Sequence, residues 1–342
     1  MKLQDRLQVL VKLGNLLLSD YGQSELEPIY RRAQAANGWF SPEQSKYTIT
    51  QVANQFLNAT ALENWVSNYA IPETTRPLKT IGLVLAGNIP AVGFHDILCC
   101  FVAGHKAKIK YAEKDKILIP YLLEQLSIIA PETSAYFEAV DRLNNFDAVI
   151  ATGSDNSARY FDHYFSKHPN IIRHNRNSVA ILTGDETEEE IQRLSEDIFR
   201  YYGLGCRSVS KLYVPKGYDF MAFMKVMDQY VDSMEHNKYI NNYDYNRSVY
   251  LLNNVPHLAN EILTLVEHPS LLSRISTLHY EYYENEADLV KKIKADSDKL
   301  QCVVTKMNLS GIEGVNFGES QQPTLGSYAD NVDTMEFLLS IG

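Results

Sequence analysis

The chain has 342 residues, of which 45% are apolar and 22% are charged, as in ordinary soluble globular proteins. Its formal net charge of -10 argues against non-specific nucleic-acid binding, because no basic excess is present to displace counterions. The four cysteines show no metal-ligand spacing, so we expect free thiols and no metal site. No apolar run reaches the roughly eighteen residues of a membrane span, and the N-terminal stretch resembles an amphipathic helix more than a signal peptide. We therefore expect a cytoplasmic protein.

Residues 1–70 have helical periodicity, and we expect a helical cap or an oligomer arm there. From Lys79 onward strands and helices alternate. Strands are predicted at 80–85, 106–111, 136–140, 147–152 and 178–182. Such alternation implies an α/β fold, in which a parallel sheet carries helices on both faces. We assign residues 71–184 to this domain, whose ligand should bind outside the carboxyl ends of the strands.

A second α/β unit is expected over residues 185–305. Its predicted helices are 187–202, 219–234, 256–266 and 286–294, and its predicted strands are 209–214, 277–283 and 300–305. The tail, 306–342, is polar and rich in turns until 335–339. We expect this tail to pack back onto the protein or to lie at an oligomer interface.

Cys206 lies on a glycine-flanked turn between the predicted helix 187–202 and the predicted strand 209–214. Gly203 and Gly205 allow backbone angles that a side chain would forbid, and they let a ligand approach closely. A thiol at such a bend can face a substrate. The alternative is a small buried apolar residue beside a helix-ending glycine, which is the commoner fate of a lone cysteine.

Three further motifs follow ends of predicted strands. Asn88, in a Gly-Asn-Ile-Pro turn, could donate its amide to a developing oxyanion, or could be ordinary turn chemistry. Lys110 and Glu113 follow the next strand, and an ammonium and a carboxylate so placed can hold a ribose diol; a solvated strand end is the alternative. Gly153 and Ser154 open a helix, which can place backbone N–H groups against a pyrophosphate.

In this order the motifs resemble those of the aldehyde dehydrogenase superfamily, and in particular its fatty acyl-CoA reductase branch, the LuxC-type reductases. The Asn88 turn is similar to the asparagine-proline oxyanion motif. Lys-Tyr-Ala-Glu at 110–113 resembles the lysine-proline-small-glutamate cofactor motif, with tyrosine where proline is usual. Thr-Gly-Ser at 152–154 resembles the cofactor turn, and Gly-Leu-Gly-Cys at 203–206 resembles the nucleophile motif.

The resemblance covers roughly residues 35–305 and implies an aldehyde-dehydrogenase-like fold, with a nicotinamide-cofactor domain followed by a catalytic thiol domain. It implies that Cys206 is the nucleophile and that Asn88 stabilises the oxyanion. Contacts to the cofactor would come from four residues: Lys110, Glu113, Gly153 and Ser154. The resemblance favours NADPH, whereas a Glu113 carboxylate that accepts from a ribose hydroxyl would crowd a 2′-phosphate and favours NADH.

Hydrolytic members of the superfamily carry a glutamate base in a leucine-glutamate-leucine-glycine-glycine segment, where it activates water. The corresponding stretch here, 172–177, has neither a carboxylate nor a glycine pair. Without that base, acyl exchange with a thiol becomes the natural second half-reaction. Three basic residues of this stretch could face the phosphates of coenzyme A, or could instead pair with surface acids such as Asp185: Arg173, His174 and Arg176.

The resulting hypothesis is an acyl-CoA reductase that forms a thioester on Cys206 and releases an aldehyde, with the long acyl chain implied by the resemblance. A hydrolytic aldehyde dehydrogenase, a cysteine acyl carrier or acyltransferase without redox chemistry, and a non-catalytic scaffold are the alternatives. Residues 221–250, rich in Met, Tyr and Phe, could line an acyl tunnel or could pack in the core. The expected partners are an acyl-CoA, or an acyl-protein donor, and further copies of the chain.

Overall fold

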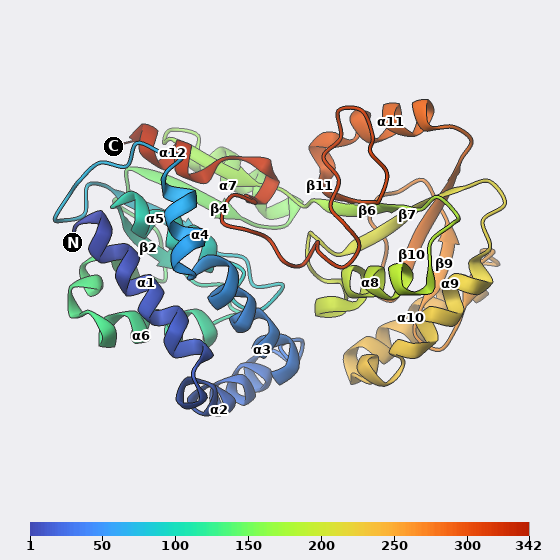
Figure 1. Cartoon of the computed structure of the whole chain (residues 1–342), viewed down its shortest axis with the longest axis horizontal. Coiled ribbons are helices and arrows are strands. Elements are labelled where there is room, and N and C mark those ends of the chain that lie inside the picture. The colour runs from blue at the N-terminus through green and yellow to red at the C-terminus, as the bar shows by residue number, and fades with distance from the viewer. Residues whose placement is uncertain (342) are drawn as a thin grey trace. The chain divides into compact units, whose positions relative to one another are not determined.

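The protein is described by a computed structural model that covers residues 1–341, except for the side chain of Asp155. The chain divides into two compact units (Figure 1). The first unit contains Met1–Asn175 and the residues from Pro323 onward, and the second unit contains Arg176–Gln322. The chain therefore leaves the first unit once and returns to it near its C-terminus.

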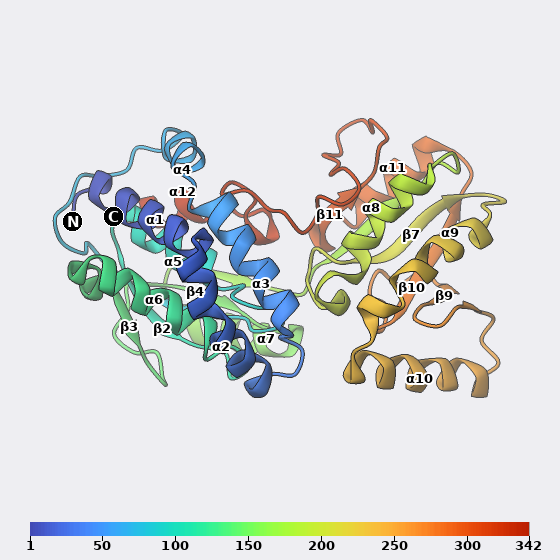
Figure 2. The same ribbon diagram turned by 60° about the horizontal axis from the view of Figure 1, so that its bottom comes forward.

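The first unit begins with a group of helices: α1 (Leu3–Leu18), α2 (Asp20–Ala36), α3 (Pro42–Gln51) and α4 (Ala59–Val66). Helix α1 buries Leu10, Leu13 and Leu17 at helical spacing, and their core continues into the core beneath the first sheet. Figure 2 shows α1 running beside α6 (Leu118–Ile129). The predicted helical region 1–70 thus shares one apolar core with the strands that follow it.

The first sheet has the strand order β3-β2-β1-β4-β5, and all its strands are parallel. Its strands are β1 (Thr80–Val84), β2 (Lys106–Lys110), β3 (Phe137–Ala139), β4 (Ala148–Thr152) and β5 (Asn170–Arg173). The other α-helices between the strands of this sheet are α5 (Phe94–Ala103) and α7 (Asp155–Phe165). The predicted parallel α/β fold is confirmed. The strand order reverses between β1 and β4, and such a reversal is where open parallel sheets bind their ligands.

The strand predicted at 178–182 does not belong to this sheet. Strand β6 (Asn177–Ile181) pairs with β7 (Val209–Pro215) and β11 (Leu300–Val304) in the second unit, so the prediction that it closes the first sheet is wrong. Strand β5, which the sequence analysis did not predict, takes the edge position instead.

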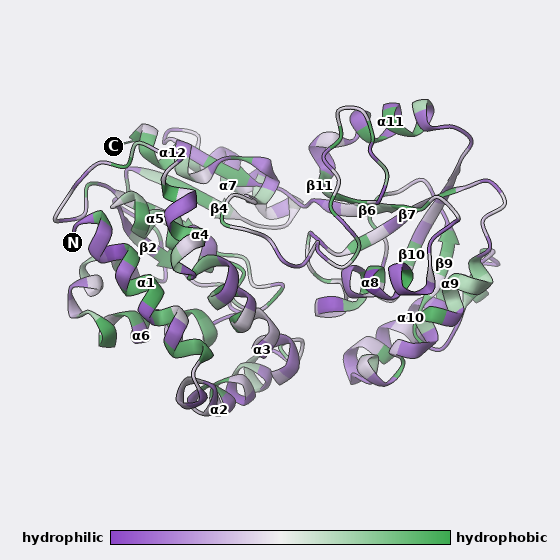
Figure 3. Ribbon diagram, viewed as in Figure 1, coloured by the Kyte–Doolittle hydropathy of each residue, from purple (hydrophilic) through white to green (hydrophobic). Residues whose placement is uncertain are grey.

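The second unit contains a six-stranded sheet in the order β11-β6-β7-β10-β9-β8, parallel except at β8. Its remaining strands are β8 (Leu258–Ala259), β9 (Thr264–Glu267) and β10 (Thr277–Tyr283). Its helices are α8 (Glu188–Phe199), α9 (Phe220–Met227), α10 (Asn237–Leu252) and α11 (Glu286–Ala295). In Figure 3 the helix α8 is mostly hydrophilic, whereas strand β4 of the first unit is hydrophobic.

The helix predicted at 256–266 is wrong, because β8 and β9 occupy that stretch. Leu263, Leu265 and Val266 are all buried, which suits a strand covered on both faces. The Met-rich segment 221–250 forms α9, two short turns and α10, and buries Met224, Met227 and Tyr239 in the second unit.

The C-terminal segment returns to the first unit as α12 (Thr334–Ile341). Met335 and Leu338 are buried, and the carbonyl oxygen of Leu338 lies 3.0 Å from His105 Nε2 at the start of β2. These residues pack back onto the protein, as we expected of the tail. No helix within residues 1–341 has both the length and the apolar sequence needed to cross a bilayer.

Candidate active site

The turn that carries Cys206 follows α8 in the second unit. Helix α8 begins with the predicted capping box, in which the Thr187 and Glu190 side chains each accept a hydrogen bond from the other's backbone N–H. After α8 the backbone reverses through Tyr201, Tyr202 and Gly203, whose φ angles are 55°, 58° and 73°. Left-handed geometry is expected for the glycine but is uncommon for tyrosine. We call residues 201–208 the nucleophile turn, after the role that the sequence leads us to expect for Cys206.

Hydrogen bonds hold the backbone on both sides of Cys206. Ser178 Oγ donates to the Cys206 carbonyl oxygen at 2.9 Å. The Ser208 N–H donates to the Gly205 carbonyl oxygen at 3.0 Å, and Ser208 Oγ accepts from the Gly205 N–H at 3.2 Å. Cys206 is half-buried, whereas Cys99, Cys100 and Cys302 are buried. The alternative of a thiol packed in a dry core therefore does not describe Cys206.

The guanidinium of Arg207, the residue after Cys206, contacts a second cysteine. Its Nη1 donates to Cys302 Sγ at 3.1 Å, and Cys302 lies opposite Ser178 in the register between β11 and β6. A cation is thus held beside the nucleophile turn, where its charge can favour a thiolate.

Asn88 follows β1, as predicted, and is exposed, whereas Gly87 and Pro90 of the same turn are buried. A Cβ on neighbouring Gly87 would lie 2.7 Å from the Cβ of Ala112, so this turn packs directly on the segment 110–115. Asp115 Oδ2 also accepts from the Ala91 N–H at 2.7 Å. Because both contacts join the turn after β1 to the loop after β2, the predicted Asn88 and Lys110–Glu113 motifs lie side by side.

Asp115 also belongs to this region, although it lies outside the predicted motifs. Its carboxyl is buried, and burial raises its pKa to about 6, although hydrogen bonds from the Ala91, Leu118 and Ile119 N–H groups lower it. An aspartate shortly before an apolar helical run, here 117–129, is a helix-capping signal, which could have identified it.

The predicted cofactor residues lie at the ends of two parallel strands, β2 and β4, which flank β1 in the first sheet. Lys110 is exposed at the end of β2, and the exposed Glu113 carboxylate pairs with Lys116 at 2.6 Å. Ser154 caps α7 directly after β4 by accepting from the Ser157 N–H at 3.4 Å. A Cβ on Gly153 would lie 2.8 Å from the Ser157 Cβ, so only glycine permits this close join of strand and helix.

These residues fit a nicotinamide nucleotide. β1, β2 and β4 are adjacent and parallel, so the Asn88 turn, Lys110 and Gly153 lie at the same carboxyl edge of the first sheet. That edge combines the reversal of strand order, a helix N-terminus for phosphate, and an ammonium with a carboxylate for a ribose. The structure thus brings together every predicted site residue of residues 71–154, and Cys206 belongs to the second unit.

Arg173 does not face a phosphate, and this corrects the expectation for it. Its guanidinium is buried and makes two hydrogen bonds to the Asp96 carboxylate, at 2.5 and 2.8 Å, and one to Thr334 Oγ1 at 3.0 Å. Burial alone would lower its pKa, but the Asp96 carboxylate reverses the effect and raises it. The alternative partner Asp185 pairs with Lys306 instead.

The other two basic residues of this stretch have different surroundings. His174 is exposed, and its Nε2 lies 3.8 Å from a carboxylate oxygen of Asp162. Arg176 Nη1 donates to the carbonyl oxygens of Leu300 and Ser297, at 3.2 and 3.4 Å. A role for either in binding coenzyme A stays a prediction. Within residues 1–341 no three His, Cys, Asp or Glu side chains are grouped to hold a metal ion.

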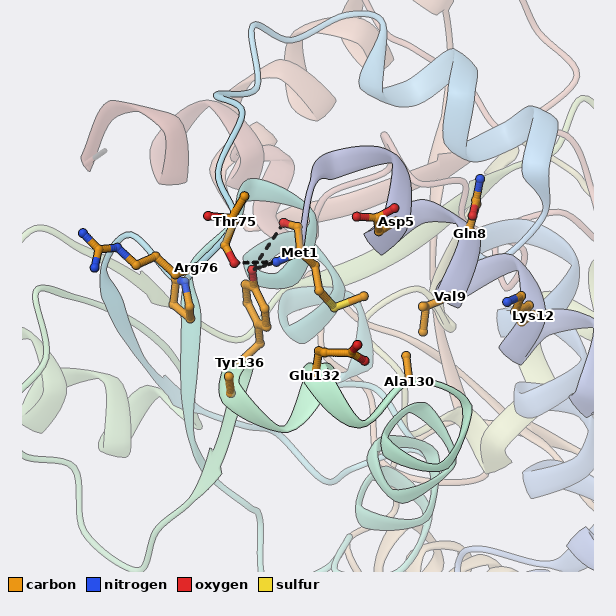
Figure 4. Close-up of a pocket in the computed structure, with 12 residues that line it drawn as sticks. Met1, Asp5, Gln8, Val9, Lys12, Thr75, Arg76, Ala130, Glu132 and Tyr136 are labelled. Carbon is orange, nitrogen blue, oxygen red and sulfur yellow. Dashed lines mark hydrogen bonds between the residues drawn. The ribbon is translucent and has the colours of Figure 1, made fainter.

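A cavity of about 600 Å³ lies elsewhere in the first unit (Figure 4). Its lining includes Thr75 and Pro77, which precede β1, and Tyr136, which precedes β3. Those residues mark the amino ends of the strands, opposite the edge with Asn88 and Lys110. The Met1 ammonium closes one side of it by donating to the Thr75 carbonyl oxygen and the Tyr136 hydroxyl. This cavity is therefore separate from the candidate site.

Solved structures with the same fold are aldehyde dehydrogenases and related oxidoreductases. Aldehyde dehydrogenase 21 from Physcomitrella patens, solved with its product succinate, is 15% identical, with a TM-score of 0.72 over 100% of this chain and 84% of that one. An NADP-dependent enzyme of E. coli is 15% identical, with a TM-score of 0.70 over 93% and 78%. The indole-3-acetaldehyde dehydrogenase AldA of P. syringae, solved with NAD+, is 12% identical, with a TM-score of 0.67 over 91% and 74%. The fold is therefore that of the aldehyde dehydrogenases.

The family follows from the sequence itself. The family described as Acyl-CoA reductase (LuxC) matches residues 32–240, which is more than half of the chain. The protein belongs to this LuxC acyl-CoA reductase family, and it is an oxidoreductase that acts on aldehyde or acyl groups. No curated protein sequence matches the chain. The family and the fold both point to a nicotinamide cofactor.

Proposed function

We propose that this protein reduces a long-chain fatty acyl-CoA to the aldehyde with NADPH or NADH, through a covalent thioester on Cys206. The observation that carries the proposal is the nucleophile turn. Of the four cysteines, all of them within the described residues, Cys206 alone is not buried, and its backbone is held by Ser178 and Ser208. A cysteine held at a rigid, half-exposed turn suits covalent catalysis.

The first half-reaction is acyl transfer to the protein. Cys206 Sγ, as a thiolate, attacks the thioester carbonyl carbon, and the bond from that carbon to the sulfur of coenzyme A breaks. Coenzyme A leaves as a thiolate and takes up a proton, while the acyl group stays on Cys206. The Asn88 side-chain amide and the Cys206 backbone N–H are the proposed donors to the oxyanion. Loss of one such donor typically costs about 2.7–4 kcal/mol of transition-state stabilisation.

The second half-reaction turns the acyl-enzyme into an aldehyde. A reduced nicotinamide, when bound, supplies the hydride for the acyl carbon. Lys110, Glu113, Gly153 and Ser154 are the proposed residues that hold the dinucleotide. The hemithioacetal on Cys206 forms as an alkoxide, whose electron pair re-forms the carbonyl as the carbon–sulfur bond breaks, so the aldehyde leaves and Cys206 is restored as a thiolate.

The stretch 172–177 supports reduction over hydrolysis. It contains no carboxylate that could serve as a base for water. Its first cation, Arg173, is engaged with Asp96. A thioester on Cys206 should therefore persist until hydride or a thiol reaches it. The hydrolytic aldehyde dehydrogenase and the cysteine acyl carrier are the competing functions.

Mass spectrometry after incubation with an acyl-CoA tests the proposal. The wild-type protein should gain one acyl group on Cys206, and addition of NADPH or NADH should release the aldehyde. Cys206→Ala should show neither the adduct nor oxidation of the reduced cofactor. Cys100→Ala removes a buried thiol of the first unit, which the proposed chemistry does not use, and should keep the adduct.

Each competing function predicts a different result. A stable adduct that reduced cofactor does not discharge would indicate an acyl carrier, and release of free acid would indicate hydrolysis. Turnover by Cys206→Ala would reject the nucleophile. The same assay with acyl-CoAs of graded length, and with NADPH and NADH in turn, shows which chain length and which cofactor the protein prefers. The expected homo-oligomer is tested by sedimentation of the same protein.

A further inference from the structure

We propose that Gln321 is a positioning residue for Cys206, and that it acts through Ser208. Gln321 lies in the returning segment 316–322, which we call the clamp segment. The inference rests on the proposed role of Cys206 as the nucleophile. It concerns contacts that lie entirely within the second unit.

The clamp segment is anchored on α8, the helix that leads into the nucleophile turn. Asp197 is fully buried on α8, and its two carboxylate oxygens accept from the Gly318 and Ser320 N–H groups, at 2.6 and 2.9 Å. Gly318 has a φ of 86°, and a Cβ there would lie 3.2 Å from the Cβ of Arg193. The backbone of the segment therefore packs directly against the helix.

The Gln321 side chain extends from this anchored segment to the nucleophile turn. Gln321 is buried, and its Nε2 donates to Ser208 Oγ at 3.3 Å. The same oxygen accepts from the Gly205 N–H at 3.2 Å. Ser208 Oγ therefore receives two donors, one from the clamp segment and one from the residue before Cys206. Removal of Gln321 leaves the hydroxyl to be held by the turn alone.

The turn needs such support because its entry is conformationally costly. Tyr201 and Tyr202 both have positive φ angles, a conformation that persists only where surrounding contacts enforce it. On that side, Tyr202 packs its ring on His236 with a centroid separation of 4.5 Å. On the other side of Cys206, the hydrogen bond from Gln321 to Ser208 holds the turn. The sulfur is thus placed by contacts on both sides of the turn.

The expected effect is on the rate of chemistry and not on substrate affinity. Small displacements of a reacting atom can lower a rate by about 100-fold, so Gln321→Ala should lower kcat for acyl-CoA reduction by about 10- to 100-fold. The KM values for acyl-CoA and for reduced cofactor should stay within about twofold, since uniform binding is unchanged. A residue that merely supports folding would not separate kcat from KM in this way.

The neighbouring glutamine supplies a matched control. Gln322 is exposed, and its amide donates to the Gly318 carbonyl oxygen at 3.3 Å, so Gln322→Ala keeps the link to Ser208. Hydrogen exchange of a peptide covering residues 203–209 reports the turn directly and requires no reductase activity. We expect faster exchange in Gln321→Ala and wild-type exchange in Gln322→Ala.

A double-mutant cycle tests whether Gln321 acts through Ser208. Ser208→Ala removes the shared oxygen, so it should speed exchange and lower kcat as Gln321→Ala does, and the double variant should be no worse than Ser208→Ala alone. Should Gln321→Ala fail to fold, Ser208→Ala tests the link from its other end.

Wild-type exchange and kcat in either single variant, or additive losses in the double variant, would overturn the proposal. A wild-type protein without reductase activity would reject the proposed function, while the exchange measurement would still decide whether Gln321 positions the turn.

Discussion

Replacement of Arg173 by alanine should destabilise the first unit without weakening acyl-CoA binding. The Arg173 and Asp96 side chains are only 6% and 7% exposed, and their two hydrogen bonds form a bidentate pair. Removal of the guanidinium leaves the Asp96 carboxylate charged and buried, and it also removes the donor to Thr334. Loss of one partner from a buried pair costs about 3–5 kcal/mol, so we expect a loss of that size in the free energy of unfolding.

Tryptophan fluorescence during urea unfolding measures this loss of stability in the first unit, which contains Arg173. The chain has two tryptophans, Trp39 and Trp65, and both belong to the first unit. The midpoint of the fluorescence transition should fall while its slope m stays constant. For a unit of this size, the loss corresponds to a fall of roughly 6–20 °C in the melting temperature. The KM for acyl-CoA, measured below that temperature, should be that of the wild type.

Two controls separate the lost pair from other causes. His174→Ala, at the exposed next residue, should change the free energy of unfolding by about 0.5 kcal/mol or less. The double variant Asp96→Leu with Arg173→Met should recover much of the loss, because apolar side chains can replace a buried ion pair. An unchanged midpoint in Arg173→Ala, together with a KM raised about tenfold or more, would refute the reasoning and return Arg173 to the substrate.

Two further predictions concern the buried carboxyl of Asp197 and the close packing at Gly153. Burial raises the Asp197 pKa from 3.8 to about 6, so the folded protein binds the Asp197 proton more tightly than the unfolded chain does. This proton binding contributes up to about 3 kcal/mol to the free energy of unfolding. The contribution is fully present below pH 3.8 and is lost as the pH rises through 6. Far-UV circular dichroism during urea unfolding measures the free energy of unfolding at pH 4 and at pH 6. Its decrease between these two pH values should be smaller in Asp197→Asn than in the wild type, and an equal decrease would contradict this. Gly153→Ala should cost about 1–3 kcal/mol, because the new methyl would meet Ser157 and Phe161. Gly326→Ala, where a Cβ meets nothing within 4 Å, should be nearly neutral by the same fluorescence measurement, and equal losses would count against the packing argument.

The parts of the fold that depend on short-range sequence could be predicted. Strands β1 and β4 are apolar runs that end at glycine turns, and both were expected within a residue or two of their bounds. The assignment of β6 to a sheet could not be predicted, because its residues Asn177–Ile181 suit either parallel sheet. Its place depends on pairing with β11, which lies far along the chain.

The candidate site divides in the same way. Cys206, Asn88 and Gly153 lie in short motifs whose chemistry is visible in the residues themselves. Arg173 was misinterpreted because its partner Asp96 lies 77 positions away, so a basic residue in a polar run gave no sign of being buried. Gln321 went unnoticed for the related reason that it acts through a contact that only the folded chain creates.

The nucleophile turn shows why a motif alone does not define this site. Gly203 is the residue that the motif provides for left-handed geometry, but the structure also places Tyr201 and Tyr202 there. Two such residues are unfavourable by themselves, so the shape of the turn has to be enforced by contacts outside the motif. Such contacts include the ring of His236 on one side of Cys206, and Gln321, through Ser208, on the other. A chain that kept Gly-Leu-Gly-Cys but lost these contacts would retain the cysteine that we propose as nucleophile and lose its placement.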